Sequence, residues 1–255
     1  MAKPREGVAS LDVRQCADAA QLQAYLDDVW QRHPQRTVLL EGLLEGDLFT
    51  LETLGDGQHL QAIGGFKVRL SPPPHFVECE AQWDAQVDTP VIAQALAQLR
   101  AFGVGFGLCH SEFILTRDGP VLVEINYRSI GDRREFLLDA MFGQQWFAAA
   151  LAPHLGQPLP LLHSERTHAL LRYYVAEHAG ELVSASDDRN HRSAHSDVQY
   201  RRMRVPGEQI RLSHSNKDYL GVLSALARDA DALQQAVHQA EAGLQWRIDP
   251  PELRA

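Results

Sequence analysis

Two glutamates stand at a spacing that would place them face to face on a β-hairpin. Residues 109–129, CHSEFILTRDGPVLVEINYRS, contain two β-prone runs around a turn signal at residues 116–120. If the hairpin is centred on Asp118, Glu112 lies directly across from Glu124, because each is six positions from the centre. Side chains at paired positions share one face of a sheet, so the sequence predicts two neighbouring carboxylates.

Strand alternation adds more polar groups to the same face. Asn126 should lie beside Glu124, and His110 beside Glu112. Two carboxylates directly opposite each other are destabilising unless a positive charge lies between them. Magnesium takes oxygen ligands, typically one or two carboxylates with water and substrate phosphates, which is what this face offers. Arg128 continues the alternation and could bind a phosphate or carboxylate through two hydrogen bonds. The alternative is that the two glutamates lie on a solvated outer face, as charged residues of antiparallel sheets often do.

The composition limits the partners that the chain can have. Its 255 residues, 45 % of them apolar, can bury the core of one large domain or two small ones. With 24 Lys and Arg against 33 Asp and Glu, the net charge is −9, which argues against binding to nucleic acid or an anionic membrane. No apolar run approaches the roughly 20 residues that cross a bilayer, and the first ten residues contain no signal-peptide core.

The cysteines indicate the compartment. Cys16, Cys79 and Cys109 are far apart and form no Cys-x-x-Cys or Cys/His pattern, which argues against a zinc site and a disulfide framework. We therefore expect a cytoplasmic protein.

Helix and strand signals alternate along the chain, which predicts mixed layers of helix and sheet. Apolar spacing and end signals predict helices over residues 16–33, 89–103, 132–155 and 218–244. Runs of β-prone residues between turn signals predict strands over residues 37–44, 47–54, 59–70 and 167–178, besides the hairpin. We expect the first three of these strands to form an antiparallel meander.

The hairpin sequence resembles a known family signature. Residues 110–132, HSEFILTRDGPVLVEINYRSIGD, closely resemble the terminal signature of the ATP-grasp enzymes: H-x-E, a hairpin with DGP, then E-I-N-x-R and a glycine. In that family the two glutamates and the asparagine bind magnesium, and the arginine stabilises acyl-phosphate chemistry. The resemblance implies that Glu112, Glu124 and Asn126 are metal ligands and that Arg128 is catalytic.

Two upstream stretches resemble the same family and occur in its order. Residues 37–47, TVLLEGLLEGD, are similar to the hinge strand that hydrogen-bonds adenine. Residues 3–10, KPREGVAS, are similar to a strand end and small-residue loop that closes over the nucleotide phosphates. The resemblance implies that ATP is bound by Lys3, Gly7, Ser10, Glu41, Gly42, Leu43 and Leu44.

A third stretch suggests residues for the substrates. Residues 64–78, GGFKVRLSPPPHFVE, resemble a segment of amino-acid ligases in which a lysine contacts phosphate or substrate, which makes Lys67 a candidate catalytic residue. The alternative is a strand lysine that faces water. The residues that we expect around the acceptor substrate are His110, Ser129, Gly131 and Asp132.

The resemblance implies an ATP-grasp fold of the α+β class, an antiparallel sheet with flanking helices. We expect residues 1–40 to form part of the lid, 41–160 the nucleotide- and metal-binding core, and 161–255 a C-terminal strand-helix extension packed on the core. The resemblance begins at Lys3, whereas family members have a substrate domain and more of the lid before this point. We therefore expect the N-terminal substrate domain and part of the lid to be missing.

Two further positions depart from the family pattern. Leu48 stands where several ligases have a glutamate for the ribose, and Glu45 or Asp47 could substitute for it. The phosphate loop has Leu11-Asp12 where Arg-Gly is often found.

The predicted function is an ATP-dependent ligase. It would activate a small carboxylate as an acyl phosphate for attack by an amine or a similar nucleophile, with ATP and magnesium, or manganese, as cofactors. The alternative is a non-catalytic nucleotide- and metal-binding chain, or a fragment. In that case a partner chain or a second copy of the chain would complete the cleft.

Overall fold

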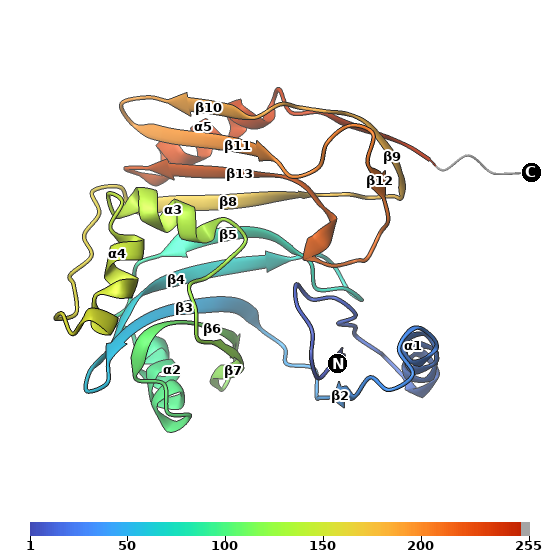
Figure 1. Cartoon of the computed structure of the whole chain (residues 1–255), viewed down its shortest axis with the longest axis horizontal. Helices are drawn as coiled ribbons and strands as arrows, with labels where there is room; N and C mark the ends of the chain where they lie inside the picture. The colour runs from blue at the N-terminus through green and yellow to red at the C-terminus, as the bar shows by residue number, and fades with distance from the viewer. Residues whose placement is uncertain (251–255) are drawn as a thin grey trace, which may run out of the picture.

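A large sheet forms the centre of the molecule (Figure 1). The computed structural model describes residues 1–250, and within them nine strands pair in the order β10-β11-β13-β8-β5-β4-β3-β6-β7, each antiparallel to its neighbours. In chain order these strands are β3 (Asp47–Asp56), β4 (Leu60–Leu70), β5 (Glu78–Asp84), β6 (Phe106–Thr116), β7 (Gly119–Asn126), β8 (His168–Val175), β10 (Arg189–Arg192), β11 (Ser196–Arg202) and β13 (Tyr219–Ala227).

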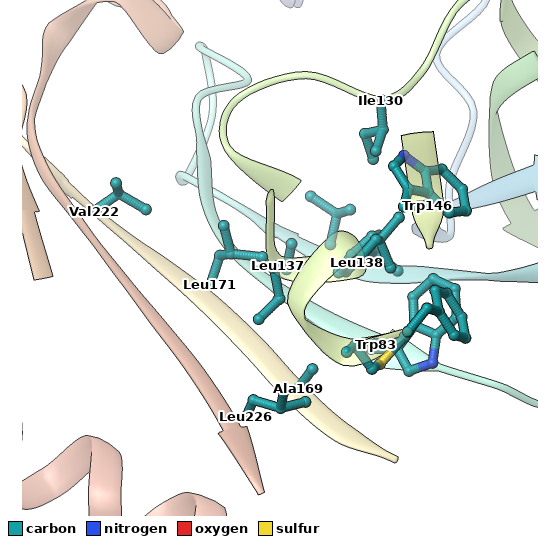
Figure 2. Close-up of a cluster of buried hydrophobic side chains, with 14 of the residues drawn as sticks. Trp83, Ile130, Leu137, Leu138, Trp146, Ala169, Leu171, Val222 and Leu226 are labelled. Carbon is teal, nitrogen blue, oxygen red and sulfur yellow. The ribbon is translucent and has the colours of Figure 1, made fainter. Parts of the chain in front are cut away.

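Helices cover both faces of this sheet (Figure 1). The face under α3 (Arg134–Met141) and α4 (Trp146–Leu151) carries the largest apolar cluster, which includes Leu138 of α3, Trp146 of α4 and Leu171 of β8 (Figure 2). On the other face, α2 (Pro90–Ala101) covers β3 and β6, and α5 (Ala230–Glu241) covers β8, β11 and β13. Consecutive residues of β8 serve opposite faces, since Leu170 belongs to the α5 cluster and Leu171 to the α3 cluster.

The N-terminal residues form a smaller unit beside the sheet (Figure 1). Strands β1 (Ala2–Pro4) and β2 (Val38–Leu40) pair antiparallel, and α1 (Ala19–Arg32) packs on them through Tyr25 and Val29. Within residues 1–250, two backbone hydrogen bonds join this unit to the large sheet and its loops, from Gln15 N to Pro74 O at 3.0 Å and from Asn216 N to Ala9 O at 3.0 Å.

A third sheet closes one end of the molecule. It contains β12 (Gln209–Ile210), β9 (Gly180–Ala185) and β14 (Trp246–Asp249), in that order. Two short 3-10 helices complete the elements, η1 (Pro153–Leu155) and η2 (Asn216–Asp218). None of the helices within residues 1–250 is long and apolar enough to cross a membrane.

Two of the predicted helices form close to their expected bounds. Asp18 begins α1 by accepting a hydrogen bond from Gln21 N, and Thr89 does the same for α2 from Ile92 N, so each supplies an N-terminal cap. The single helix predicted over residues 132–155 is wrong, because the chain breaks between α3 and α4. Gly143 and Gln144 both adopt left-handed φ angles there, of 64° and 65°.

The prediction of one long helix over residues 218–244 is also wrong. Residues 219–227 form β13, and only residues 230–241 form a helix, α5, capped by Asp229. Strand β13 lies between β11 and β8 and is apolar toward both faces. A strand buried on both faces has no alternation, so its sequence is hard to distinguish from a buried helix.

The predicted meander is correct only in part. Strands β3, β4 and β5 are consecutive neighbours, but residues 38–40 pair with β1 instead of β3. The sheet also continues across the proposed boundary at residue 160, because β5 pairs with β8. The division into 1–40, 41–160 and 161–255 stays a prediction, and its last five residues lie outside the described part of the chain.

Truncation of the core beneath α3 should cost substantial stability. Leu171 is fully buried at the centre of the sheet, so we expect Leu171→Ala to lower the free energy of unfolding by about 2–5 kcal/mol. Urea unfolding followed by circular dichroism measures this change. Leu161→Ala is the control, since that side chain is 91 % exposed. Equal losses in the two variants would contradict the assigned core.

Candidate functional site

A β-bulge sets the register of the predicted hairpin. From the two-residue turn, Thr116 pairs with Gly119, and continuing this register would place Glu112 opposite Val123. The pairing instead skips Val123 and matches Glu112 with Glu124. The prediction that the two glutamates face each other is therefore confirmed.

The same register brings the other polar residues of the hairpin together. His110 pairs with Asn126, one position further along the shared face, so both lie beside the two glutamates. The turn is centred between Arg117 and Asp118 and not on Asp118, as the sequence had suggested. The bulge at Val123 shifts the pairing by one residue, and for this reason the expected pairs still form.

The electrostatics of this face favour a bound cation. Although Glu124 is exposed as a residue, the protein around its carboxyl group raises its pKa, and the nearby Glu112 carboxylate adds to the rise. His110, Arg128 and a hydrogen bond from Asn126 act in the opposite direction without reversing it. A cation between the two carboxylates would relieve this repulsion.

The donor set suits a hard divalent ion. Glu112 and Glu124 offer carboxylate oxygens and Asn126 an amide oxygen, which is the chemistry that magnesium and manganese prefer. Within residues 1–250, no group of three or more His, Cys, Asp and Glu side chains could hold a metal alone. An ion at this face would therefore need Asn126 and oxygen atoms from water or a bound phosphate to complete its coordination.

His110 is placed differently from our expectation. It is buried, and its ring joins two carboxylates: Nδ1 lies 2.8 Å from Glu52 Oε1 and Nε2 lies 3.4 Å from Glu112 Oε1. Burial alone would lower the pKa of His110, but the two carboxylates outweigh it and raise the pKa to about 10. Both ring nitrogens are thus occupied, and His110 has no group left to offer an acceptor substrate.

The loop after β7 holds the remaining expected substrate residues. Arg128 is exposed, and its Nη1 donates to Ser129 O at 2.9 Å, while Ser129 Oγ accepts from Trp146 Nε1 at 2.9 Å. The backbone at Gly131 lies beside the same guanidinium, since an added Cβ would be 3.7 Å from Arg128 Nη1. Asp132 has a raised pKa, chiefly because protein surrounds its carboxyl group, while Arg128 opposes the rise. These residues adjoin the glutamate pair.

A buried ion pair, which the sequence did not suggest, fixes this loop. Arg134 is 3 % exposed and pairs with Glu78, and its Nε donates to Tyr173 Oη at 3.2 Å. Tyr173 Oη in turn donates to Asp132 O at 2.8 Å. The backbone of Asp132 is left-handed, with φ of 55°, so the hydrogen bond from Tyr173 helps to hold an otherwise unfavourable conformation.

The predicted phosphate loop approaches the same region. Gly7 and Ser10 lie in a loop that contains left-handed residues, among them Ser10 with φ of 56°. Asn216 N donates to Ala9 O in this loop, and the Asn216 side chain hydrogen-bonds Glu78: Nδ2 donates to Glu78 Oε1 at 3.3 Å, and Oδ1 accepts from Glu78 N at 3.0 Å. Asn216, a residue that had no recognisable signal in the sequence, thus connects the loop to the ion pair of Glu78 and Arg134.

The structure also joins the predicted lid lysine to the predicted hinge. Lys3 Nζ lies 2.6 Å from Glu41 Oε2, because β1 and β2 are paired. Gly42, Leu43 and Leu44 follow in the link from β2 to β3, and all three are exposed. The segment for which the resemblance implies adenine binding is therefore accessible at the surface.

Lys67 is separated from the other site residues. It pairs with Phe49 across β3 and β4, and Phe49 stacks on Phe113 beneath α2, so its side chain lies on the face opposite Glu112. Lys67 Nζ is 2.8 Å from Asp84 Oδ2, at the wall of a cavity of about 600 Å³ on that face. The structure does not bring Lys67 to the glutamate pair.

The arrangement of the sheet matches solved enzymes. An L-amino acid ligase from Bacillus licheniformis superposes with a TM-score of 0.74 at 16 % identity, covering 97 % of this chain and 64 % of the ligase. A biotin carboxylase domain of 2-oxoglutarate carboxylase from Hydrogenobacter thermophilus was solved with MgADP and bicarbonate. It superposes with a TM-score of 0.67 at 14 % identity, covering 97 % of this chain and 57 % of that domain's chain. Phosphoribosylglycinamide synthetase from Anaerococcus prevotii superposes with a TM-score of 0.62 at 11 % identity, covering 91 % of this chain and 61 % of the synthetase.

These neighbours are ATP-grasp enzymes, so the chain has the ATP-grasp fold that the sequence predicted. No family model matches the sequence. A curated relative, uncharacterized protein y4rH of Sinorhizobium fredii, is 27 % identical over 259 residues, which cover 97 % of this chain and 53 % of the relative. The chain therefore spans about half the length of that relative.

Loss of one partner of the buried ion pair should destabilise the fold. Arg134→Met leaves the Glu78 charge buried without its partner, so we expect the free energy of unfolding to fall by about 3–5 kcal/mol. Urea unfolding measures the loss. Adding Glu78→Gln to Arg134→Met should restore part of it, because the double variant buries no unpaired charge. A double variant as unstable as the sum of the two single changes would contradict this account.

The position of Lys67 leads to a separate prediction. Because its side chain faces away from the glutamate pair, we expect Lys67→Met to change any affinity of the chain for ADP with magnesium by less than about twofold. Isothermal titration calorimetry measures the affinity. A large loss in this variant, against no loss in Arg117→Met on the exposed turn, would show that Lys67 acts on the nucleotide after all.

Proposed function

We propose that this chain is the nucleotide- and metal-binding part of an ATP-dependent ligase that forms a bond between a small carboxylic acid and an amine or similar nucleophile. The observation that carries the proposal is the pairing of Glu112 with Glu124, and of His110 with Asn126, on one face of the hairpin that leads into Arg128. The neighbouring structures support it through their shared fold, and two of them are an amino acid ligase and a domain solved with MgADP.

In the proposed reaction, a carboxylate oxygen of the acid attacks the γ-phosphorus of ATP. The bond from that phosphorus to the β,γ-bridging oxygen breaks, which gives ADP and an acyl phosphate. The amine nitrogen then attacks the acyl carbon, the carbon–oxygen bond to phosphate breaks, and a proton leaves the nitrogen. Catalysis of this kind depends mainly on positioning and charge neutralisation, so no nucleophilic side chain is needed.

Each group of site residues has a role in this scheme. Glu41, Gly42, Leu43 and Leu44 would receive the adenine, and Lys3, Gly7 and Ser10 the phosphates. Glu112, Glu124 and Asn126 would hold magnesium or manganese, which when bound neutralises charge on the nucleotide phosphates. Arg128, exposed next to this face, would balance charge on the transferred phosphoryl group. Ser129, Gly131 and Asp132 would lie along the path of the acceptor.

The proposed setting follows from composition and thiol chemistry. We propose a reducing, cytoplasmic setting, in which Cys16, Cys79 and Cys109 would remain free thiols. The expected partners are ATP and small acids and amines, rather than nucleic acid or a membrane.

The second candidate is a chain that binds nucleotide and metal without turnover until a partner chain or a second copy completes the cleft. Leu48 favours it, because this residue is buried in the apolar cluster at the position where several ligases use a glutamate for the ribose. Asp47 and Glu45 are exposed nearby and could supply the missing oxygen. Calorimetry with ADP and magnesium, combined with an assay for ADP release from ATP, separates the two candidates. Binding without release favours the second.

Removal of one metal-binding carboxylate tests the ligase proposal. We expect Glu124→Gln to abolish magnesium-dependent ADP release and to weaken the binding of manganese in the presence of ADP, because the amide removes a negative ligand. A coupled assay and electron paramagnetic resonance measure the two effects. The matched control is Asp118→Asn, whose side chain is 83 % exposed on the turn of the same hairpin. Undiminished magnesium-dependent ATP consumption in Glu124→Gln would refute the proposal.

A further inference from the structure

A charged residue lies buried on β3, the strand next to β6, beside the glutamate pair. Glu52, on β3, is completely inaccessible to solvent. Its Oε1 lies 2.8 Å from His110 Nδ1 and accepts a hydrogen bond from Thr50 Oγ1 at 3.2 Å. Its Oε2 is buried and has no hydrogen-bond partner among residues 1–250.

Such a carboxylate is costly for the fold. Transfer of an ionised group out of water is strongly unfavourable, and an unpaired oxygen adds to the cost. Leu48 and Leu54, on the same face of β3, show that apolar side chains pack well along this strand. An apolar residue at position 52 would therefore serve stability better than an acid. The acid must contribute something other than packing.

His110 connects this carboxylate to the metal-binding face. Glu52 and His110 are paired positions on β3 and β6, so their side chains share a face at a separation that two strands fix. The opposite edge of the same imidazole reaches Glu112, with Nε2 at 3.4 Å from Oε1. Glu52, His110 and Glu112 thus form a continuous chain of contacts from the interior to the hairpin.

We propose that Glu52 and His110 are positioning residues for the metal site: Glu52 fixes the imidazole of His110, and His110 holds one oxygen of Glu112 so that the other is directed at the cation. The inference rests on the proposed function, because it assigns a role toward the same cation. Carboxylate ligands of metals are commonly oriented by hydrogen-bonded partners behind them, and loss of such a partner typically costs about 10- to 100-fold in metal affinity or activity.

The test compares Glu52→Gln, His110→Asn and the double variant in the full chain. Manganese affinity in the presence of ADP is measured by electron paramagnetic resonance, and thermal unfolding is measured on the same samples. We expect each single variant to bind manganese about 10- to 100-fold more weakly. If Glu52 acts through His110, the double variant should bind no more weakly than His110→Asn alone.

A matched control separates positioning from mere structural support. Ser111→Ala changes a fully buried polar residue next to His110, on the opposite face of β6. It should alter the unfolding temperature without altering manganese affinity. His110→Gln replaces His110→Asn if the latter does not fold.

The outcomes distinguish this inference from the proposed function. If Glu124→Gln weakens manganese binding but Glu52→Gln does not, the positioning role is wrong and the metal site stands. Additive losses in the double variant would show that Glu52 does not act through His110, which also overturns the inference. If the unaltered chain binds no manganese with ADP, the proposed metal site fails, and the positioning role fails with it.

Discussion

Strand β6 lies between β3 and β7, and its register to both neighbours decides which side chains meet. A slip by one residue would turn every side chain of a strand to the other face. On the β7 side, the bulge at Val123 sets the register, so that Glu112 meets Glu124. On the β3 side, ten consecutive pairs place Glu52 against His110. The glutamate pair, the contact of Glu52 with His110 and the loop that follows β7 all depend on this alignment.

Two buried pairs of opposite charge adjoin the candidate site. Glu52 and His110 lie beside the glutamate pair, while Arg134, paired with Glu78, holds the loop that contains Asp132 through Tyr173. Neither is a favourable way to stabilise a fold, since desolvation offsets most of the attraction between buried charges. Charged groups held by rigid strands do, however, keep fixed directions in the absence of ligand. Such preorganisation is what the proposed phosphoryl transfer would require.

The extent to which the sequence predicted this site depended on how local each signal was. Glu112 and Glu124 belong to one hairpin, so their spacing and the family resemblance identified them together. Lys67 was grouped with them by order along the chain, but strand alternation turned it toward α2. Glu52 became recognisable as part of the site only when β3 was paired with β6, although an acid in an apolar strand was an available signal. Asn216 reaches the loop from the far end of the chain, and no local pattern predicts such a contact.

The hydrogen bond from Asn216 to Ala9 has a consequence for the order in which the chain folds. That contact closes a long loop, and so does the pairing of β5 with β8, where Glu80 and Arg172 are 92 positions apart. Closing a long loop costs conformational entropy. The hairpin of β6 and β7 closes over a two-residue turn and carries no such penalty. We therefore expect the glutamate pair to form early in folding, and the loop of Gly7 and Ser10 to be joined to Asn216 only after the C-terminal strands have joined the sheet.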